Sequence, residues 1–197
     1  MAGRRAGAQA TRETIARAAI GLFVERGFAR TTIEAIAAAA DVAPQTVYAV
    51  FGSKAAIAGE LRLYLERMAD IPASFQSTLA EDDPHRQVEK IVALDRYIAE
   101  QHGDLYELIA NTKDSELAAV REELDAAKRS GMERIVERLQ AKNALRPGLS
   151  SARAVDILCA LPLIHLYRQL VTRSGWTPVQ FESWVAGVVK AAILAQA

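Results

Sequence analysis

The sequence predicts an all-α fold of about nine helices, with a three-helix N-terminal head and a larger helical body. Two observations predict this fold. Residues 31–54, TTIEAIAAAADVAPQTVYAVFGSK, fit two short helices joined by a tight turn, the second with one apolar and one polar face. This is the helix-turn-helix pattern, whose second helix can enter the DNA major groove. Beyond it, apolar residues recur at helical spacing. We therefore expect a helix-turn-helix head at residues 1–54 and a helical body at residues 55–197.

The first helix of the head is expected between Thr11 and Gly27. Thr11 is a candidate N-cap, and Gly27 is a candidate stop because glycine readily adopts the left-handed conformation that ends many helices. Five apolar residues fall at helical spacing between them: Ile15, Ala18, Ala19, Leu22 and Phe23. The helix therefore has one face to bury.

The second helix is predicted to open at Thr31, because Thr31 and Glu34 have the spacing of a capping box. Ile33 and Ile36 lie on its buried face. Asp41 follows in the turn, where a left-handed residue is expected and aspartate tolerates that conformation better than most residues. The motif therefore turns at Asp41.

The third helix begins near Pro44, since proline is favoured in a first turn. Its apolar face is formed by Val47, Val50 and Phe51. The opposite face groups four residues at helical spacing: Pro44, Gln45, Tyr48 and Ala49. On DNA, an amide can bond a base edge, a methyl can contact thymine, and hydroxyls such as those of Tyr48 and Thr46 can reach phosphates.

Lys54 follows Ser53, the expected N-cap of a fourth helix. A cation in a first helical turn opposes the helix dipole at a cost of about 0.3–1 kcal/mol. A contact with a DNA phosphate accounts for this placement. The alternative is an exposed lysine that tolerates the penalty.

These residues resemble the N-terminal DNA-binding domain of TetR-family transcriptional regulators. The residues that carry the resemblance are Phe23-x3-Gly27-Phe28, Thr31-Thr32-x3-Ile36-Ala37, Val42, Thr46-Val47-Tyr48 and Phe51-x2-Lys54. The resemblance implies phosphate contacts from Thr32, Tyr48 and Lys54, and base contacts from Pro44, Gln45 and Ala49. Ala43 departs from the family pattern because many members have a capping serine there.

The resemblance also implies a function. It indicates a dimeric repressor that binds a palindromic double-stranded DNA operator and is released by a small-molecule effector. The alternative is a helical ligand-binding protein or enzyme in which the head is only structural. A module that binds another protein through the apolar C-terminal helices is a third possibility.

Charge and composition agree with a DNA-binding head. The chain of 197 residues has no formal net charge, but residues 1–54 hold seven Lys or Arg against four Asp or Glu. The basic excess therefore lies in the head. The sequence shows no signal peptide and no apolar run long enough to span a membrane, so a cytoplasmic protein is expected.

The body is predicted to contain six helices, separated by breaks at Ile71-Pro72, His102-Gly103 and Leu145 to Gly148. Their expected ranges are 53–70, 84–102, 104–112, 115–141, 151–173 and 177–195. Gly131 and Pro162 are expected to bend the helices that contain them.

The last two helices are apolar on nearly all sides, which predicts burial on more than one face. A dimer interface accounts for this pattern, and the alternative is the core of a single protomer. The residues expected in the interface are Leu161, Leu166, Phe181, Trp184 and Val188.

The chain lacks the sequence motifs of phosphate-binding loops, nucleophile elbows and zinc proteases, so no enzymatic activity, cofactor or metal site is expected. The three histidines are far apart in sequence and lack cysteine partners. An effector cavity is expected in the body, because polar and aromatic residues interrupt its apolar helices. The candidates are Tyr97, His102, Tyr106, Asn111 and His165.

Overall fold

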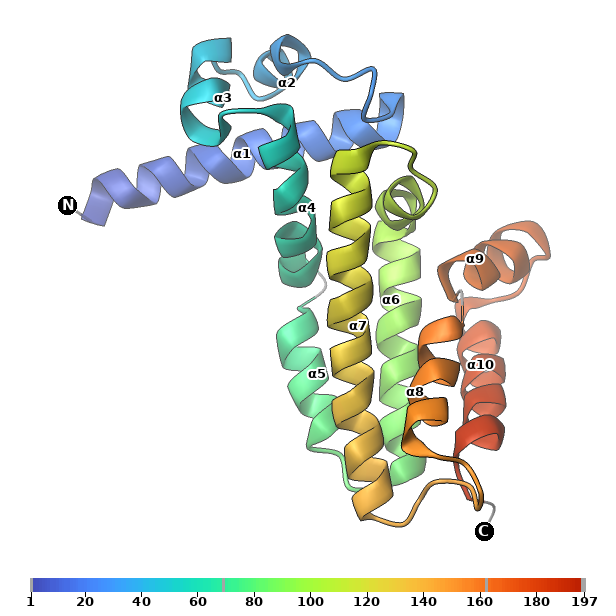
Figure 1. Cartoon of the computed structure of the whole chain (residues 1–197). Helices are drawn as coiled ribbons and strands as arrows, with labels where there is room; N and C mark the ends of the chain where they lie inside the picture. The colour runs from blue at the N-terminus through green and yellow to red at the C-terminus, as the bar shows by residue number, and fades with distance from the viewer. Residues whose placement is uncertain (1, 69, 162, 196–197) are drawn as a thin grey trace. The chain divides into compact units, whose positions relative to one another are not determined.

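The computed structural model describes residues 2–68, 70–161 and 163–195. Across these ranges the chain forms ten α-helices and one short π-helical segment (Figure 1). The β pairing found in the described ranges is one isolated antiparallel bridge between Leu145 and Leu194. The expectation of an all-α fold is therefore confirmed.

The chain packs as two compact units. The first contains Met1–Tyr64 and Asp104–Glu123, and the second contains Leu65–Gly103 and Leu124–Ala197. Three helices contribute residues to both units, because the divisions after Tyr64, Gly103 and Glu123 each fall within a helix. The functional boundary expected at residue 54 stays a prediction, since it concerns which segment acts on DNA.

Four helices open the chain: α1 (Ala2–Arg26), α2 (Ile33–Ala39), α3 (Pro44–Phe51) and α4 (Lys54–Met68). Seven large side chains of these helices have no solvent exposure: Ile15, Phe23, Ile36, Val47, Ile57, Leu61 and Leu65. The Phe23 and Phe28 rings lie 5.0 Å apart at the end of α1. Removal of such surface from water is the main favourable term that holds short helices together.

The start of α1 differs from the expectation. The helix begins at Ala2, and Thr11 lies inside it, where its hydroxyl donates to the Gly7 carbonyl oxygen at 3.0 Å. Thr11 is therefore not the N-cap. Alanines are frequent in the preceding residues, and alanine has the highest helix propensity, so the helix continues toward the N-terminus. The stop at Gly27 is confirmed by its φ of 84°.

The N-cap of α2 is Thr32, and the expectation of Thr31 is wrong. Thr32 has extended backbone angles, and its side-chain oxygen accepts from the Ala35 amide at 3.1 Å. Thr31 is 2% exposed, and its hydroxyl lies 2.9 Å from the Gly27 carbonyl oxygen. Because capping starts one residue later, Glu34 does not have capping-box spacing. Thr31 instead secures the loop to the end of α1.

The second unit is built mainly from α5 (Ile71–Leu79), α6 (Pro84–Ala110), α7 (Ser115–Ala141), α8 (Ser151–Ala160), α9 (Leu163–Tyr167), η1 (Arg168–Arg173) and α10 (Pro178–Ile193). All of these α-helices contribute to one apolar core. Its fully buried members are Val88, Leu139, Ala154, Phe181 and Ile193. The core side chains come from separate helices, so packing holds this unit together.

The break expected at His102-Gly103 is wrong, because α6 continues to Ala110. A glycine costs a helix only about 1 kcal/mol relative to alanine. Gly103 is buried, and a Cβ there would lie 3.7 Å from Ile164 Cγ2. Burial along this face outweighs the glycine penalty.

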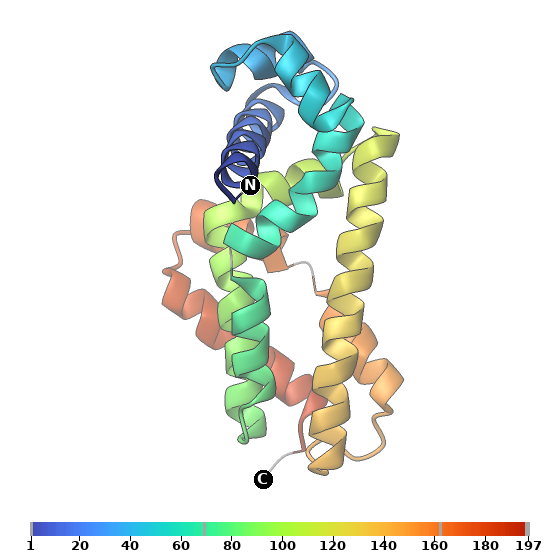
Figure 2. The same cartoon turned by 90° about the vertical axis from the view of Figure 1, so that its left-hand side faces the viewer.

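Helix α5 is a further difference from the expected helices, whereas α7 has the expected bounds. The segment after Ile71-Pro72 forms α5, with the proline in its first turn, where a missing N–H is tolerated. The expected helix ranges leave these residues without a helix. Helix α7 is continuous (Figure 2), and the bend expected at Gly131 stays a prediction. Gly131 lets a neighbouring ring approach, since a Cβ there would lie 3.3 Å from Phe75 Cε2.

The C-terminal helices agree in part with the expected ranges. The bend expected at Pro162 falls on a residue outside the described ranges. Helix α8 ends at Ala160 before it, and α9 begins at Leu163 after it. Thr177 caps α10 through a capping box with Gln180.

In the described part of the chain, no single helix is long and apolar enough to cross a membrane. Helix α8 and residues Leu163–Arg173, which are bent by 45° relative to each other, pass that test only as a pair.

Candidate functional site

Helix α3 presents a polar face opposite its buried face. Val47 has no solvent exposure and Phe51 is 8% exposed, so these side chains anchor the helix to the core. Gln45, Tyr48 and Ala49 are exposed, and Tyr48 is 51% exposed. Burial of one face therefore turns the residues expected to meet DNA toward solvent.

The turn before α3 has the expected conformation. Asp41 adopts φ of 53°, and the Val42 amide donates to the Ala37 carbonyl oxygen at 3.0 Å. Pro44 occupies the first turn of α3, and Ala43 is an N-cap without a side-chain hydrogen bond. The turn geometry is confirmed, and the absence of a capping hydroxyl at Ala43 is a property of this chain.

Lys54 binds the carbonyl of Thr31, the residue directly before Thr32 in the chain. The Lys54 ammonium donates to the carbonyl oxygens of Phe28 at 2.8 Å and Thr31 at 3.1 Å, and it stands 4.3 Å from the Phe28 ring centroid. Ser53 accepts from the Ala56 amide at 3.1 Å, as expected for an N-cap of α4. An ammonium has three donors. The two carbonyls therefore leave one donor of the ammonium.

The five effector residues expected in the body differ in their exposure and in their neighbours. Tyr97 and His102 lie on α6 with ring centroids 6.3 Å apart. His102 Nε2 is buried and has no hydrogen-bond partner among the described residues, and burial lowers the pKa of this imidazole. Asn111 and His165 are exposed, and the half-buried Tyr106 belongs to the first compact unit. Tyr97 and His102 are thus the pair that the structure brings together.

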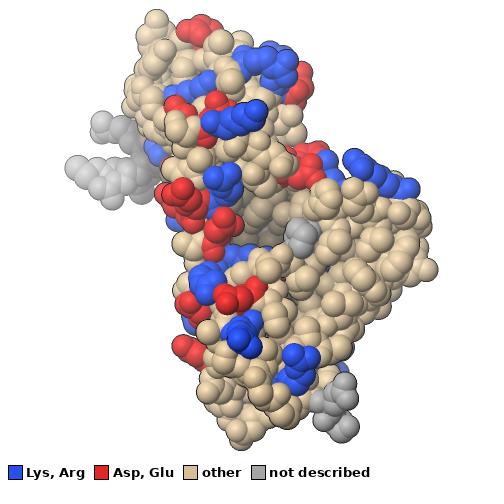
Figure 3. All heavy atoms as spheres, turned by 45° about the vertical axis from the view of Figure 1, so that its right-hand side comes forward, with Lys and Arg blue, Asp and Glu red and all other residues tan. Residues whose placement is uncertain are grey.

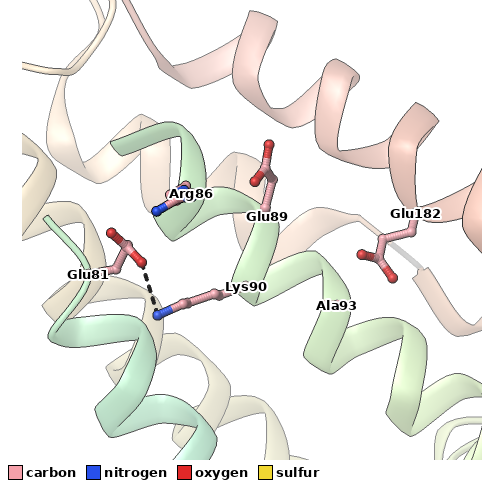
Figure 4. Close-up of a pocket in the computed structure, with 6 residues that line it drawn as sticks. All are labelled: Glu81, Arg86, Glu89, Lys90, Ala93 and Glu182. Atoms are coloured by element: carbon pink, nitrogen blue, oxygen red, sulfur yellow. Dashed lines mark ion pairs between the residues drawn. The ribbon is translucent and has the colours of Figure 1, made fainter. Parts of the chain in front are cut away.

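A recess of about 310 Å³ lies between α6 and α10, and its lining is charged. Its lining residues are Glu81, Arg86, Glu89, Lys90, Ala93 and Glu182. Figure 4 shows Lys90 and Glu81 pointing toward each other, at 3.0 Å. None of the five expected effector residues lines this recess.

Helix α10 has one charged and one uncharged face. Its two charged residues both turn to α6: Glu182 pairs with Arg96 at 2.6 Å, and Lys190 pairs with Glu89 at 2.5 Å. Figure 3 shows a broad face of the body with few charged side chains.

The residues expected in a dimer interface divide into two groups. Trp184 and Val188 are 43% and 42% exposed on α10, and the Trp184 ring contacts Trp176 edge to face at 5.8 Å. Phe181 has no solvent exposure and packs against Tyr167 at 5.2 Å, so it serves the core of its own protomer. The remaining two, Leu161 and Leu166, are half-buried.

In the described ranges, no group of three or more His, Cys, Asp or Glu side chains is arranged to hold an ion. Cys159 is half-buried on α8, and burial raises the pKa of its thiol. A raised thiol pKa lowers the thiolate fraction, which makes this cysteine a poor nucleophile.

A helix-turn-helix with an exposed polar second helix, joined to an all-α body, defines a DNA-binding regulator. Residues 15–61 match the family model of bacterial regulatory proteins of the tetR family. Residues 15–61 are therefore the DNA-binding domain of a TetR-family transcriptional regulator, as the sequence resemblance implies, and this family is not enzymatic. None of the curated proteins matches the chain in sequence.

Solved structures share the fold over nearly the whole chain. The SmeT–triclosan complex has a TM-score of 0.76 at 22% identity and covers 95% of this chain and 93% of its own. NalD, the secondary repressor of the MexAB-OprM multidrug efflux pump in Pseudomonas aeruginosa, has a TM-score of 0.72 at 22% identity, with coverages of 95% and 98%. FadR, a fatty acid degradation regulator from Bacillus halodurans, has a TM-score of 0.75 at 16% identity, with coverages of 91% and 94%.

Proposed function

We propose that this regulator is a homodimeric repressor that binds a palindromic operator through α3 and leaves it when a small molecule binds the body. The observation that carries the proposal is the exposed polar face of α3, with Tyr48 51% exposed above the buried Val47. A recognition helix of this kind contacts base edges from the major groove. We place the protein in the cytoplasm with its DNA.

The residues of this face have distinct roles. Gln45 reads a base edge with its amide, and Pro44 and Ala49 make apolar contacts beside it. Thr32, Thr46, Tyr48 and Lys54 contact phosphates, which set the register of the helix on the duplex. The free donor of Lys54 supports its part, because the two carbonyl bonds hold the ammonium beside the N-terminus of α2.

Dimerisation is supported by the uncharged face of α10. Trp184 and Val188, four residues apart and therefore on one side of this helix, are 43% and 42% exposed. An exposed apolar patch of this kind marks a protein interface. A two-fold dimer places two copies of α3 on half-sites about 34–36 Å apart, which accounts for a palindromic operator.

The effector is a mostly apolar small molecule that binds the body near Tyr97 and His102, with Tyr106, Asn111 and His165 as further candidates. The triclosan complex of SmeT and the repressor role of NalD support this class of function. A hundredfold loss of operator affinity requires about 2.7 kcal/mol of coupling, and operator DNA must weaken the effector by the same factor.

The test of DNA binding is selection from random-sequence DNA with the purified full-length protein, followed by titration of the selected sequence and of the protein's own upstream region at several salt concentrations. We expect a palindrome and an affinity that falls steeply with salt. Recovery of no palindrome, together with salt-insensitive binding, would contradict the proposal.

The test of the effector is a thermal-shift screen of apolar metabolites and drugs, with triclosan as one probe. Compounds that stabilise the protein are then added to the operator complex, and release is measured. Stabilising compounds that leave the complex intact would show binding without regulation and would contradict the repressor mechanism.

A further inference from the structure

The guanidinium of Arg12 joins three helices of the head. Its Nη1 donates to the Val50 carbonyl oxygen of α3 at 3.1 Å, and its Nη2 pairs with the Glu60 carboxylate of α4 at 2.6 Å. Its Cζ lies 4.4 Å from the Phe51 ring centroid. Arg12 itself belongs to α1. One side chain thus contacts both the end of α3 and the side of α4.

The contact with α3 gives one of its C-terminal carbonyls a hydrogen-bond partner. The last carbonyls of a helix have no partners within it, and a cation at a C-terminus also complements the helix dipole. Helix α3 spans eight residues, has no side-chain N-cap bond and has no acidic residue in its first turn. A helix this short is not stable in isolation, so its orientation depends on anchors from other elements.

The contact with α4 is partly shielded from solvent. The Glu60 side chain is 16% exposed and the Arg12 side chain is 37% exposed. Lys54 binds α4 to the loop before α2 through the Phe28 and Thr31 carbonyls. Helix α4 is therefore held to the head at two points, and the Arg12 bridge is the one that reaches α3.

We propose that Arg12 is a positioning residue for DNA binding. It contacts no DNA, and it fixes the orientation of α3 relative to α4 by holding Val50 and Glu60 at the same time. The planar fork of an arginine allows two partners at fixed angles, which the single ammonium of a lysine does not reproduce. The inference rests on the proposed function, because orientation matters through the fit of Gln45 and Tyr48 to an operator.

The test compares Arg12→Gln and Glu60→Gln with Arg17→Gln, which removes the same charge from an exposed position on α1. We expect Arg12→Gln and Glu60→Gln each to weaken operator binding by about tenfold, which equals about 1.4 kcal/mol, with Arg17→Gln close to wild type. The double variant should weaken binding by about as much as either single variant, because both remove one bridge. Arg12→Lys should recover only part of the loss.

The salt dependence of operator affinity distinguishes a positioning role of Arg12 from a direct contact with DNA. Loss of a phosphate contact reduces the salt slope by about one, whereas loss of a positioning contact leaves the slope unchanged. Binding to random DNA should also stay close to wild type. A reduced slope, or an equal loss on random DNA, would make Arg12 a DNA contact and overturn the proposal.

Hydrogen exchange provides a measurement without DNA. We expect faster amide exchange in α3 of Arg12→Gln than in wild type, with unchanged protection in α1. Wild-type exchange in α3 together with wild-type operator affinity would overturn the inference while leaving the proposed function intact. If the wild-type protein selects no operator, the proposed function fails first, and the exchange result still decides whether Arg12 anchors α3.

Discussion

A Cβ atom at Gly131 of α7 would lie 3.3 Å from Cε2 of Phe75 in α5. This distance is shorter than most carbon contacts, so the glycine allows the ring to lie close to the α7 backbone. Arg134, also on α7, places its Cζ 5.0 Å from the centroid of the same ring. The glycine therefore serves packing in the second unit.

Gly131→Leu is expected to destabilise the protein by about 1–3 kcal/mol, because the added atoms displace Phe75. Gly59→Ala is the matched control, since nothing lies within 4 Å of a Cβ at that position of α4. It should stabilise by about 0.5–1 kcal/mol through helix propensity. Free energies of unfolding from denaturant titration check both, and a neutral Gly131→Leu would show that the ring is not packed there.

Thr32→Ala is expected to destabilise the head by about 1 kcal/mol, because it removes the acceptor for the Ala35 amide. Glu34→Ala should change stability by less than about 0.5 kcal/mol, since no capping box forms. Thermal unfolding of the two variants tests this assignment. Similar losses of stability in both variants would indicate that Glu34 takes part in a capping box, as the sequence predicts.

Gln45→Ala and Lys54→Gln should affect DNA binding differently. Lys54→Gln should weaken binding to all sequences and reduce the salt slope by about one, because one phosphate contact loses its charge. Gln45→Ala should mainly relax base preference at one operator position, with a loss of about 1–3 kcal/mol on the best site. Titration of operator, single-base variants and random DNA distinguishes these outcomes. An unchanged base preference in Gln45→Ala would remove that residue from base reading.

Trp184→Asp is expected to convert the dimer into a monomer, because an unpaired charge in an apolar interface costs several kcal/mol. Sedimentation velocity measures the change. Leu63→Asp provides a control, since Leu63 is 37% exposed on α4, outside the proposed interface. A Trp184→Asp variant that stays dimeric would place the interface elsewhere.

Asp95 makes stability depend on pH. This half-buried carboxyl has its pKa raised above the ordinary value of 3.8 by burial, and the charge of Lys128 opposes that shift. The native state therefore binds this proton more tightly than the unfolded chain does. The resulting stabilisation is complete below the ordinary pKa and is lost as pH rises through the raised pKa.

Asp95→Asn should accordingly raise the melting temperature at pH 7 relative to wild type, because the cost of a buried charge disappears. The gain should shrink below pH 4, where the wild-type carboxyl is protonated. Thermal unfolding of both proteins across this pH range measures the difference. A lower melting temperature for Asp95→Asn at pH 7 would show that attraction to Lys128 outweighs desolvation.

Local chemistry determined the features that the sequence predicted well. Asp41 tolerates a left-handed turn, Gly27 stops a helix, and Pro44 fits a first turn, whatever the rest of the chain does. Periodic apolar residues placed Val47 and Phe51 inside and left Gln45 and Tyr48 outside. These signals act over a few residues, so the helix-turn-helix and its polar face follow from the sequence alone.

The tertiary structure decided the features that depend on residues far away in the sequence, such as helix ends and exposed faces. Whether Gly103 breaks a helix depends on what packs against it, and Thr31 is no cap because its hydroxyl bonds the end of α1 instead. The charged residues of α10 turn to α6, which leaves Trp184 and Val188 on an uncharged face. Arg12 meets Val50 and Glu60 across 38 and 48 residues of sequence. Such contacts form only when separate helices come together, since helical spacing describes one element and not its neighbours.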